Sequence, residues 1–327
     1  MTAASEPGGR EIRIAVVGVG HLGRHHARIA ASMSGVRCVG VHDRHAGRAE
    51  EVGRDYGIPA LAGLDEVAAA AEAVVVATPT VTHAQIAETL LSRGCDVLIE
   101  KPIASTVAEA DRILSVARAH RRVVQVGHVE RYNPAVQAAL GLASDVRVVE
   151  ARRLGVFTRR GLDVDVVLDL MIHDLQIAQA LAGGAPADEV HAVGVPLVTE
   201  KTDFASARLA FAGGCVANLT ASRVSGEKVR QLRVFSPSLS LSVDMQAQSV
   251  TAFRLSREAG TPEMVPVAVA VEKDEPLARE MADFVRCVRE RGTPLVSGDA
   301  GREALVLAVG VQQAIERHRL AYEGARA

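Results

Sequence analysis

Short apolar runs alternate with helix-like periodicity over the first 127 residues of the chain. Strand patterns occur at 11–20, 37–43, 71–79, 95–102 and 122–129, and helical patterns at 21–35, 45–57, 83–94 and 107–121. Continuous Val and Ile strands separated by helices are typical of a parallel sheet with right-handed crossovers and helices on both faces. The pattern therefore predicts an α/β protein with an N-terminal Rossmann domain, a doubly wound parallel sheet, over residues 1–127.

After Pro134 the pattern changes to consecutive strands with few helices. Strand patterns lie at 145–157, 187–198, 203–214, 215–225, 230–237 and 239–245, and two helical patterns, 275–292 and 297–324, close the chain. We expect residues 128–327 to form an α+β domain with a large, open, mostly antiparallel sheet for substrate binding and oligomerisation. Whether the closing helices pack back on the first domain stays open.

One helical segment, 168–181, carries an acid and an imidazole four residues apart. Its apolar face has the spacing i, i+3, i+4, i+7 and consists of Leu168, Met171, Ile172, Leu175 and Ala178. Asp169 and His173 fall on a different face. On most helices such a pair is a solvated, weak ion pair. The other motifs of the chain decide whether this pair does more.

Composition excludes several classes of function. The chain has 327 residues, 37 Lys and Arg against 39 Asp and Glu, 3% aromatic residues and no Trp. A net charge of −2 gives no reason to expect nucleic acid or an anionic membrane as partner. The four isolated cysteines lack the spacing of a zinc site or a disulfide framework, so we expect no metal. Without an apolar leader or a membrane span, we expect a soluble, cytoplasmic protein.

A glycine-rich turn follows the first strand. Gly18, Gly20 and Gly23 match G-x-G-x-x-G between a strand and a helix, the arrangement that binds a dinucleotide pyrophosphate at a helix N-terminus. The second strand ends in Asp43, twenty residues after Gly23, where a carboxylate binds the adenosine ribose; a helix N-cap is the alternative role. Asp43 favours NAD over NADP, although Arg44 beside it can accommodate a 2′-phosphate.

Two further motifs follow strands whose ends we expect at the same edge of the sheet as the glycine-rich turn. They are ATPTVTH at 77–83 and EKP at 100–102. Lys101 near a nicotinamide could bind a substrate hydroxyl and lower its pKa, while a salt bridge to Glu100 is the structural alternative. The expected cofactor contacts are Gly18, Val19, Gly20, His21, Leu22, Gly23, Asp43, Arg44, Ala77, Thr78, Pro79, His83, Glu100 and Lys101.

Taken in order, GVGHLG, ATP, EKP and the D-x-x-x-H of LDLMIHD resemble the glucose-fructose oxidoreductase, inositol dehydrogenase and MocA (Gfo/Idh/MocA) family over nearly the whole chain. The resemblance implies an NAD(P)-dependent dehydrogenase in which Lys101, Asp169 and His173 are catalytic. Residues at i and i+4 share one helix face, so Asp169 and His173 can both point into a cleft between the domains. There an imidazole could take the proton of an alcohol as hydride leaves.

Two segments narrow the resemblance. GLDVDVV (161–167) and Gln176 depart from the broad family, which puts simple sugars and polyols in doubt. GHVERYNPAV (127–136) and DVVLDLMIHDL (165–175) are similar to the subgroup that oxidises the 3-hydroxyl of UDP-N-acetylglucosamine. Arginines before the catalytic helix suit a diphosphate. The expected substrate contacts are His128, Arg131, Tyr132, Asn133, Arg153 and Arg160.

Two other functions remain open from the residues. They are a dehydrogenase of a free polyol or monosaccharide such as an inositol, and a non-catalytic NAD(P)-binding regulator, since fold does not fix function. Retention of Lys101, Asp169 and His173 favours an enzyme, with the role of base undecided between His173 and Lys101. A polar sheet face of Ser206, Arg208, Asn218, Thr220 and Ser222 without a covering helix predicts a homodimer or homotetramer.

Overall fold

The computed structural model describes residues 10–158, 164–257 and 261–324. The chain forms two compact units. The first contains the residues up to His128 together with Leu277–Arg302, and the second contains Val129–Pro276 and the residues from Glu303 onward. In the described ranges no helix combines the length and apolarity needed to cross a bilayer.

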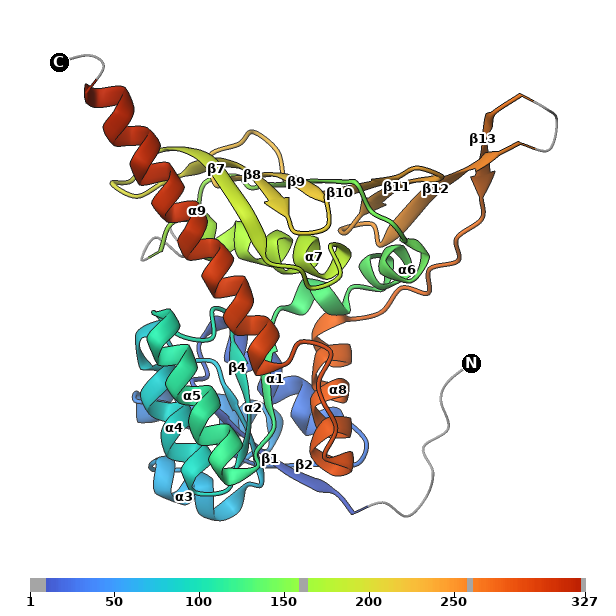
Figure 1. The fold of residues 1–327 in the computed structure, drawn as a ribbon. Helices are drawn as coiled ribbons and strands as arrows, with labels where there is room; N and C mark the ends of the chain where they lie inside the picture. The colour runs from blue at the N-terminus through green and yellow to red at the C-terminus, as the bar shows by residue number, and fades with distance from the viewer. Residues whose placement is uncertain (1–9, 159–163, 258–260, 325–327) are drawn as a thin grey trace. The chain divides into compact units, whose positions relative to one another are not determined.

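The first unit is built on a five-stranded parallel sheet in the order β2-β1-β3-β4-β5 (Figure 1). Its strands are β1 (Ile12–Val17), β2 (Val36–His42), β3 (Ala73–Val76), β4 (Asp96–Glu100) and β5 (Val124–Gly127). The crossover helices are α1 (His21–Ser32), α2 (Ala46–Tyr56), α3 (Leu64–Ala70), α4 (His83–Ser92) and α5 (Val107–His120), and α8 (Pro276–Glu290) belongs to this unit from Leu277. The order reverses beside β1, the switch point at which doubly wound sheets bind ligands.

The second unit is built on an eight-stranded sheet in the order β13-β12-β11-β10-β6-β9-β8-β7. Its strands are β6 (Val148–Leu154), β7 (Ala187–Val195), β8 (Phe204–Phe211), β9 (Val216–Ser222), β10 (Val229–Ser236), β11 (Leu239–Asp244), β12 (Ser249–Ser256) and β13 (Glu263–Val267). Every pair is antiparallel except β6 with β9. The expected fold class is therefore confirmed.

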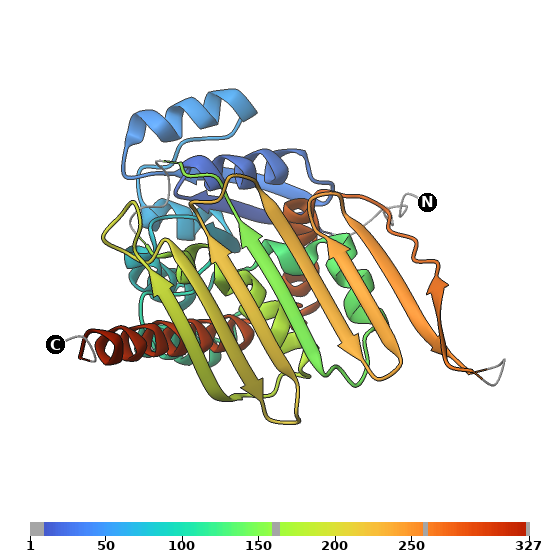
Figure 2. The ribbon, with the colours of Figure 1, turned by 90° about the horizontal axis from the view of Figure 1, so that it is seen from above.

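One face of this sheet carries the core of the second unit. The helices α6 (Pro134–Leu142) and α7 (Ile172–Leu181) and the part of α9 (Gly298–Gly324) from Glu303 onward pack their apolar side chains on it. Figure 2 shows the opposite face, along which the described strands run without a covering helix. Among the α-helices and strands of the described residues, four escaped the sequence patterns: α3, α6, β12 and β13. Ser222, expected on the open face, is buried instead, because its hydroxyl bonds the Val224 amide and the Ser225 hydroxyl in the turn after β9.

Candidate active site

The glycine-rich loop leaves β1 at Gly18 and enters α1 at Gly20. Gly18 has φ +85°, and a Cβ there would lie 2.7 Å from the Ala77 carbonyl. A Cβ at Gly23 would lie 1.8 Å from the Gly18 oxygen, so only glycine lets helix and loop approach this closely. A Cβ at Gly20, in contrast, would meet nothing within 4 Å, and no side chain caps α1. The loop therefore leaves space for a pyrophosphate at a helix N-terminus that no side chain caps, which fits a dinucleotide.

Asp43 lies just after β2 and closes this loop. Its carboxylate accepts hydrogen bonds from the backbone N–H groups of Val19 and His45, each at 3.0 Å, and lies 3.4 Å from the Arg48 guanidinium. Burial raises the pKa of Asp43, but these three donors outweigh burial and lower the pKa below its ordinary value. The ionised carboxylate keeps lone pairs for a ribose. The Val19 N–H donates to this carboxylate, and this hydrogen bond holds the glycine-rich loop in place.

Two arginines flank Asp43, of which the sequence patterns singled out only one. Arg44 is exposed and its Nε donates to the His45 ring at 3.2 Å. Arg48 lies one helical turn into α2, where it faces the Asp43 carboxylate. The signal for Arg48 was its place five residues after Asp43, in the first turn of the following helix. The neighbourhood of Asp43 is therefore more cationic than the sequence alone indicated.

The ATP and EKP loops are joined by His83. One ring nitrogen lies 2.8 Å from the Thr78 carbonyl and the other 3.0 Å from the Pro102 carbonyl. Burial lowers the pKa of His83. A neutral imidazole donates to only one of these two carbonyl oxygens, so His83 lies between the two loops and hydrogen-bonds one of them, while both ring nitrogens face backbone rather than open space. Thr78 accepts a hydrogen bond from the Thr82 hydroxyl.

Lys101 follows β4 and stands beside two buried side chains. Its backbone N–H donates to the Glu100 carboxylate at 3.2 Å. His128, at the end of the first unit, is 1% exposed, and burial together with the Lys101 charge lowers its pKa to about 3. His128 is thus a neutral imidazole at physiological pH. Lys101 itself remains partly exposed.

In the second unit, Asp169 and His173 lie on a continuous helical segment with a widened turn. Val167–Met171 is a π-helical turn and runs directly into α7. Asp165 begins it by accepting hydrogen bonds from the amides of Val167 and Leu168, each at 3.0 Å. Such π-turns occur frequently at functional sites. His173 is 9% exposed and Asp169 is half-buried, so neither belongs to a solvated stripe.

A buried ion network that the sequence patterns missed stands next to this segment. The Arg153 guanidinium donates to both oxygens of Asp174, at 2.9 and 2.7 Å, and to Glu130 at 2.6 Å. Burial lowers the pKa of Arg153, but Asp174 and Glu130 outweigh burial and raise it. With all three of its nitrogens engaged by carboxylates, Arg153 stabilises the fold rather than offering itself to a diphosphate.

The other expected substrate-binding residues differ in whether their polar groups already have hydrogen-bond partners within the protein. Asn133 caps α6 by accepting the Ala135 amide, and its Nδ2 donates to the Met245 carbonyl at 2.9 Å. Tyr132 is buried. Arg131 differs from both, because its Nε and Nη1 are buried and find no acceptor among the described residues. Arg160 lies outside the described residues.

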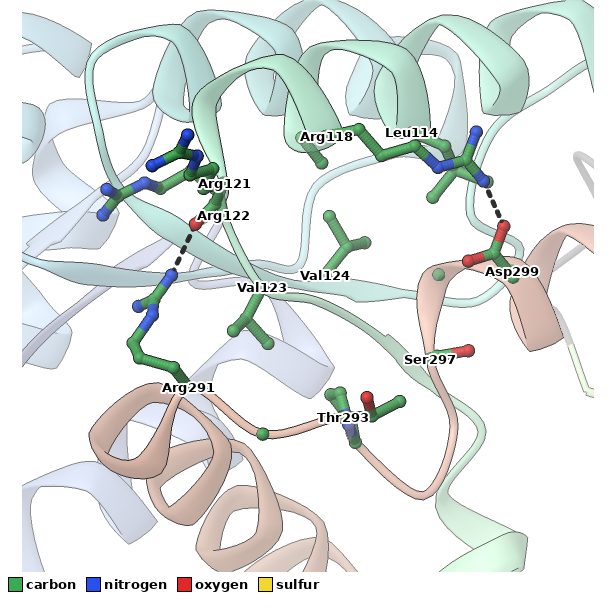
Figure 3. A pocket seen from close by; sticks show the side chains of 14 residues that line it. Leu114, Arg118, Arg121, Arg122, Val123, Val124, Arg291, Thr293, Ser297 and Asp299 are labelled. Carbon is green, nitrogen blue, oxygen red and sulfur yellow. Dashed lines mark hydrogen bonds and ion pairs between the residues drawn. The ribbon is translucent and has the colours of Figure 1, made fainter.

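Figure 3 shows a cavity of about 460 Å³ elsewhere in the first unit, lined by α5, the start of β5 and the loop before α9. Two of its arginines are engaged: Arg118 with Asp299 at 2.5 Å, and Arg291 with the Arg121 carbonyl at 2.7 Å. No expected site residue lines it. It begins at the amino end of β5, the opposite end of the sheet from the glycine loop, so it is not the cofactor site.

Comparison with known proteins agrees with this geometry. Residues 12–128 match the model of the oxidoreductase family with an NAD-binding Rossmann fold, and residues 143–238 match that of the GFO/IDH/MocA C-terminal domain. The chain belongs to the Gfo/Idh/MocA oxidoreductase family. The expected enzyme class, a dehydrogenase with an NAD-binding Rossmann domain, is confirmed by these matches.

Individual relatives place the chain more closely within the family. UDP-N-acetylglucosamine 3-dehydrogenase from Acidithiobacillus ferrooxidans is 39% identical over 313 residues, covering 93% of this chain and 97% of the relative. Its solved structure has a TM-score of 0.87 at 37% identity, covering 94% and 98% of the two chains. The scyllo-inositol 2-dehydrogenase (NAD(+)) of Bacillus subtilis is 26% identical, covering 88% of this chain and 89% of its own.

Proposed function

We propose that this protein oxidises the 3-hydroxyl of UDP-N-acetylglucosamine to a 3-keto sugar nucleotide, with NAD as the hydride acceptor. The observation that carries the proposal is 39% identity, over almost the full length of both chains, to an enzyme named for that reaction. The inositol dehydrogenase at 26% identity supports a free polyol as the second candidate substrate. A panel of UDP-sugars, free sugars and inositols separates the two.

Three residues carry the chemistry in this proposal. His173 takes the proton of the substrate hydroxyl. Lys101 binds the hydroxyl oxygen and shares that proton. Asp169 either orients the side chains of His173 and Lys101 or influences their charge. NAD, when bound, accepts the hydride that leaves the same carbon. His83 and Glu100 support Lys101 by fixing the loop that presents it. The alternative, Lys101 as the main base, requires a lysine whose pKa is lowered by a cationic neighbour.

Arg131 is the proposed contact of the substrate diphosphate. Its buried Nε and Nη1 have no acceptor within the described chain, and burial lowers its pKa. An uncompensated buried guanidinium is costly, and a phosphate oxygen would supply both the charge and the hydrogen bonds. Arg153 is excluded from this role because carboxylates already occupy it.

Substitution of Arg131 tests the substrate proposal. Arg131→Met should raise KM for UDP-N-acetylglucosamine roughly 10- to 100-fold, the worth of one hydrogen bond to a charged group, and leave the Kd of NAD unchanged. Arg152→Met, an exposed neighbour of Arg153 on β6, is the matched control. Unchanged KM in Arg131→Met would remove Arg131 from the substrate site.

The proposal also includes the choice of cofactor, the oligomeric state and the cellular compartment. Asp43 supports NAD over NADP, since its carboxylate repels a 2′-phosphate. The uncovered face of the second sheet supports a homodimer or homotetramer. The four cysteines are free thiols, which supports a reducing compartment, the cytoplasm.

A further inference from the structure

Three ionisable side chains from distant parts of the sequence meet inside the first unit. They are His26 on α1, Glu100 at the end of β4 and Glu280 on α8. All three are buried, and their nitrogen or carboxylate oxygen atoms lie within 4.8 Å of one another. The cluster adjoins the Lys101 backbone, since Lys101 follows Glu100 in the chain and its N–H donates to the Glu100 carboxylate.

Glu100 links this cluster to the Lys101 backbone. One carboxylate oxygen lies 2.7 Å from the His26 Nε2, and the other accepts the Lys101 N–H at 3.2 Å. Gly127 on β5 makes room for this carboxylate, because a Cβ there would lie 2.9 Å from the Glu100 Cδ. The position of the Lys101 main chain therefore depends on where Glu100 is held.

Glu280 places a second carboxyl group near Glu100 in a buried site, where two negative charges would repel each other. Its side chain is 0% exposed, and no N–H or O–H donor of the described residues reaches either carboxylate oxygen. Gln125 Nε2 donates to the Glu280 carbonyl at 2.9 Å, which fixes this turn of α8 against β5. Burial raises the pKa of Glu280 well above its ordinary value, and the charges of Glu100 and Asp283 raise it further.

We propose that Glu280 is a neutral carboxylic acid that donates a hydrogen bond into the Glu100–His26 pair and thereby positions Lys101. A single proton on Glu280 removes the repulsion between the two carboxylates. The proton lies between two carboxyl groups, since the Glu280 and Glu100 oxygens are within 4.8 Å of each other. Glu280 is a positioning residue, and only the catalytic role of Lys101 rests on the proposed function.

A bound divalent metal is the competing occupant of such a cluster. Two ligands of one tetrahedral zinc ion lie about 3.4 Å apart, given metal–ligand distances near 2.0–2.1 Å. The 2.7 Å between His26 and Glu100 is instead a charge-assisted hydrogen-bond distance. The geometry therefore favours a proton over a metal ion.

The pH dependence of thermal unfolding tests the protonation of Glu280. An acid whose folded-state pKa is raised gives its full stability below the ordinary pKa of 4.5 and loses it as pH rises towards the raised value. Glu280→Gln cannot titrate, so its Tm relative to wild type should rise by roughly 3 °C per pH unit above about pH 5. Glu290→Gln, exposed on the same helix, should show no such trend. A pH-independent difference for Glu280→Gln would overturn the proposal.

Infrared spectroscopy and metal analysis test the protonation of Glu280 without any substrate. Wild type at neutral pH should show the C=O stretch of a protonated carboxylic acid, and Glu280→Gln should lack it. One equivalent of tightly bound divalent metal in wild type, lost in Glu280→Gln, would overturn the proposal. These results stand even if UDP-N-acetylglucosamine proves not to be the substrate.

Turnover tests the positioning of Lys101. Glu280→Gln keeps a donor and should keep kcat within about threefold, whereas Glu280→Leu should lower kcat roughly 10- to 100-fold with KM for NAD unchanged. Rescue by Gln but not by Leu is the signature of a hydrogen-bond donor. Normal kcat in a folded Glu280→Leu variant would overturn the positioning role.

Discussion

At the scale of single residues, the Asp43 carboxylate combines a structural and a binding task. It accepts two backbone N–H groups, from Val19 and His45, and so holds the glycine-rich loop. A carboxylate has about four acceptor positions, so some remain for a ribose. These two N–H groups, together with the more distant Arg48 guanidinium, lower the pKa of Asp43 and keep the group ionised. In the proposed function, the same side chain would couple loop geometry to cofactor choice.

Asp43→Ala should weaken NAD binding and relax the preference for NAD over NADP. The Val19 amide loses its acceptor and the 2′-phosphate loses its repelling neighbour, so the two Kd values should converge in isothermal titration calorimetry. Arg44→Ala is the control and should weaken only NADP. If unmodified protein binds NADP at least as tightly as NAD, then Arg44 or Arg48, not Asp43, governs the choice.

The residues that sequence reasoning found share a local signal. The glycine loop, Asp43, Lys101, Asp169 and His173 each lie at a recognisable place on one strand or helix. Apart from Arg48, which lies five residues after Asp43, the partners that it missed come from other elements, and nothing local marks them. Glu280 lies 180 positions beyond Glu100, and Asp174 meets Arg153 only after β6 and α7 pack.

At the scale of elements, α7 is held by the Arg153–Asp174 pair beneath its first turn. Arg153 is 3% and Asp174 is 2% exposed. A buried ion pair contributes little over an apolar pair, but breaking it leaves a buried charge without a partner. The position of the preceding π-turn, and hence of Asp169 and His173, should depend on this pair.

Arg153→Met should therefore destabilise the protein by about 3–5 kcal/mol, because Asp174 keeps a buried charge. Urea unfolding measures the change, and Arg317→Met, exposed on α9, should stay within about 0.5 kcal/mol as a surface control. Replacing both partners, as Arg153→Met with Asp174→Leu, should recover most of the loss. A loss in the double variant equal to that in Arg153→Met would contradict this account.

The elements that escaped the sequence patterns have weak periodic signals. α3 has only seven residues, three of them consecutive alanines, and β13 contains a proline. α6 did carry a signal, Asn133 followed by Pro134, an N-cap with proline in the first turn. The parallel strands were predictable because buried runs of Val and Ile specify them locally. The pairing of β6 with β9 was not, since long-range packing sets it.

At the scale of the whole molecule, the open face of the second sheet carries an apolar row across several strands. Phe253 pairs with Ser240, Ser240 with Phe235, and Phe235 with Val148. Opposed residues share a face, and none of these belongs to the covered core. Arg233 lies 4.9 Å above the Phe235 ring and pairs with Glu150 at 3.1 Å. Such a mixed face suits a partner subunit.

We expect a homodimer or homotetramer formed through this face. Sedimentation equilibrium at micromolar concentration should give a multiple of 34.4 kDa, and Phe253→Asp should shift it to smaller species. Leu320→Asp, which also changes an exposed apolar residue, should leave assembly unchanged. A monomeric mass for unmodified protein would rule out the proposed interface.

The central claim, a dehydrogenase of UDP-N-acetylglucosamine that uses Lys101 and His173, is tested most directly by following NADH formation. Unmodified protein should turn over UDP-N-acetylglucosamine in preference to free sugars and inositols. His173→Ala and Lys101→Ala should each lower kcat by about 10² to 10⁴ and leave the Kd of NAD largely unchanged. Normal turnover of UDP-N-acetylglucosamine by His173→Ala would show that Asp169 and His173 are structural and would contradict the mechanism.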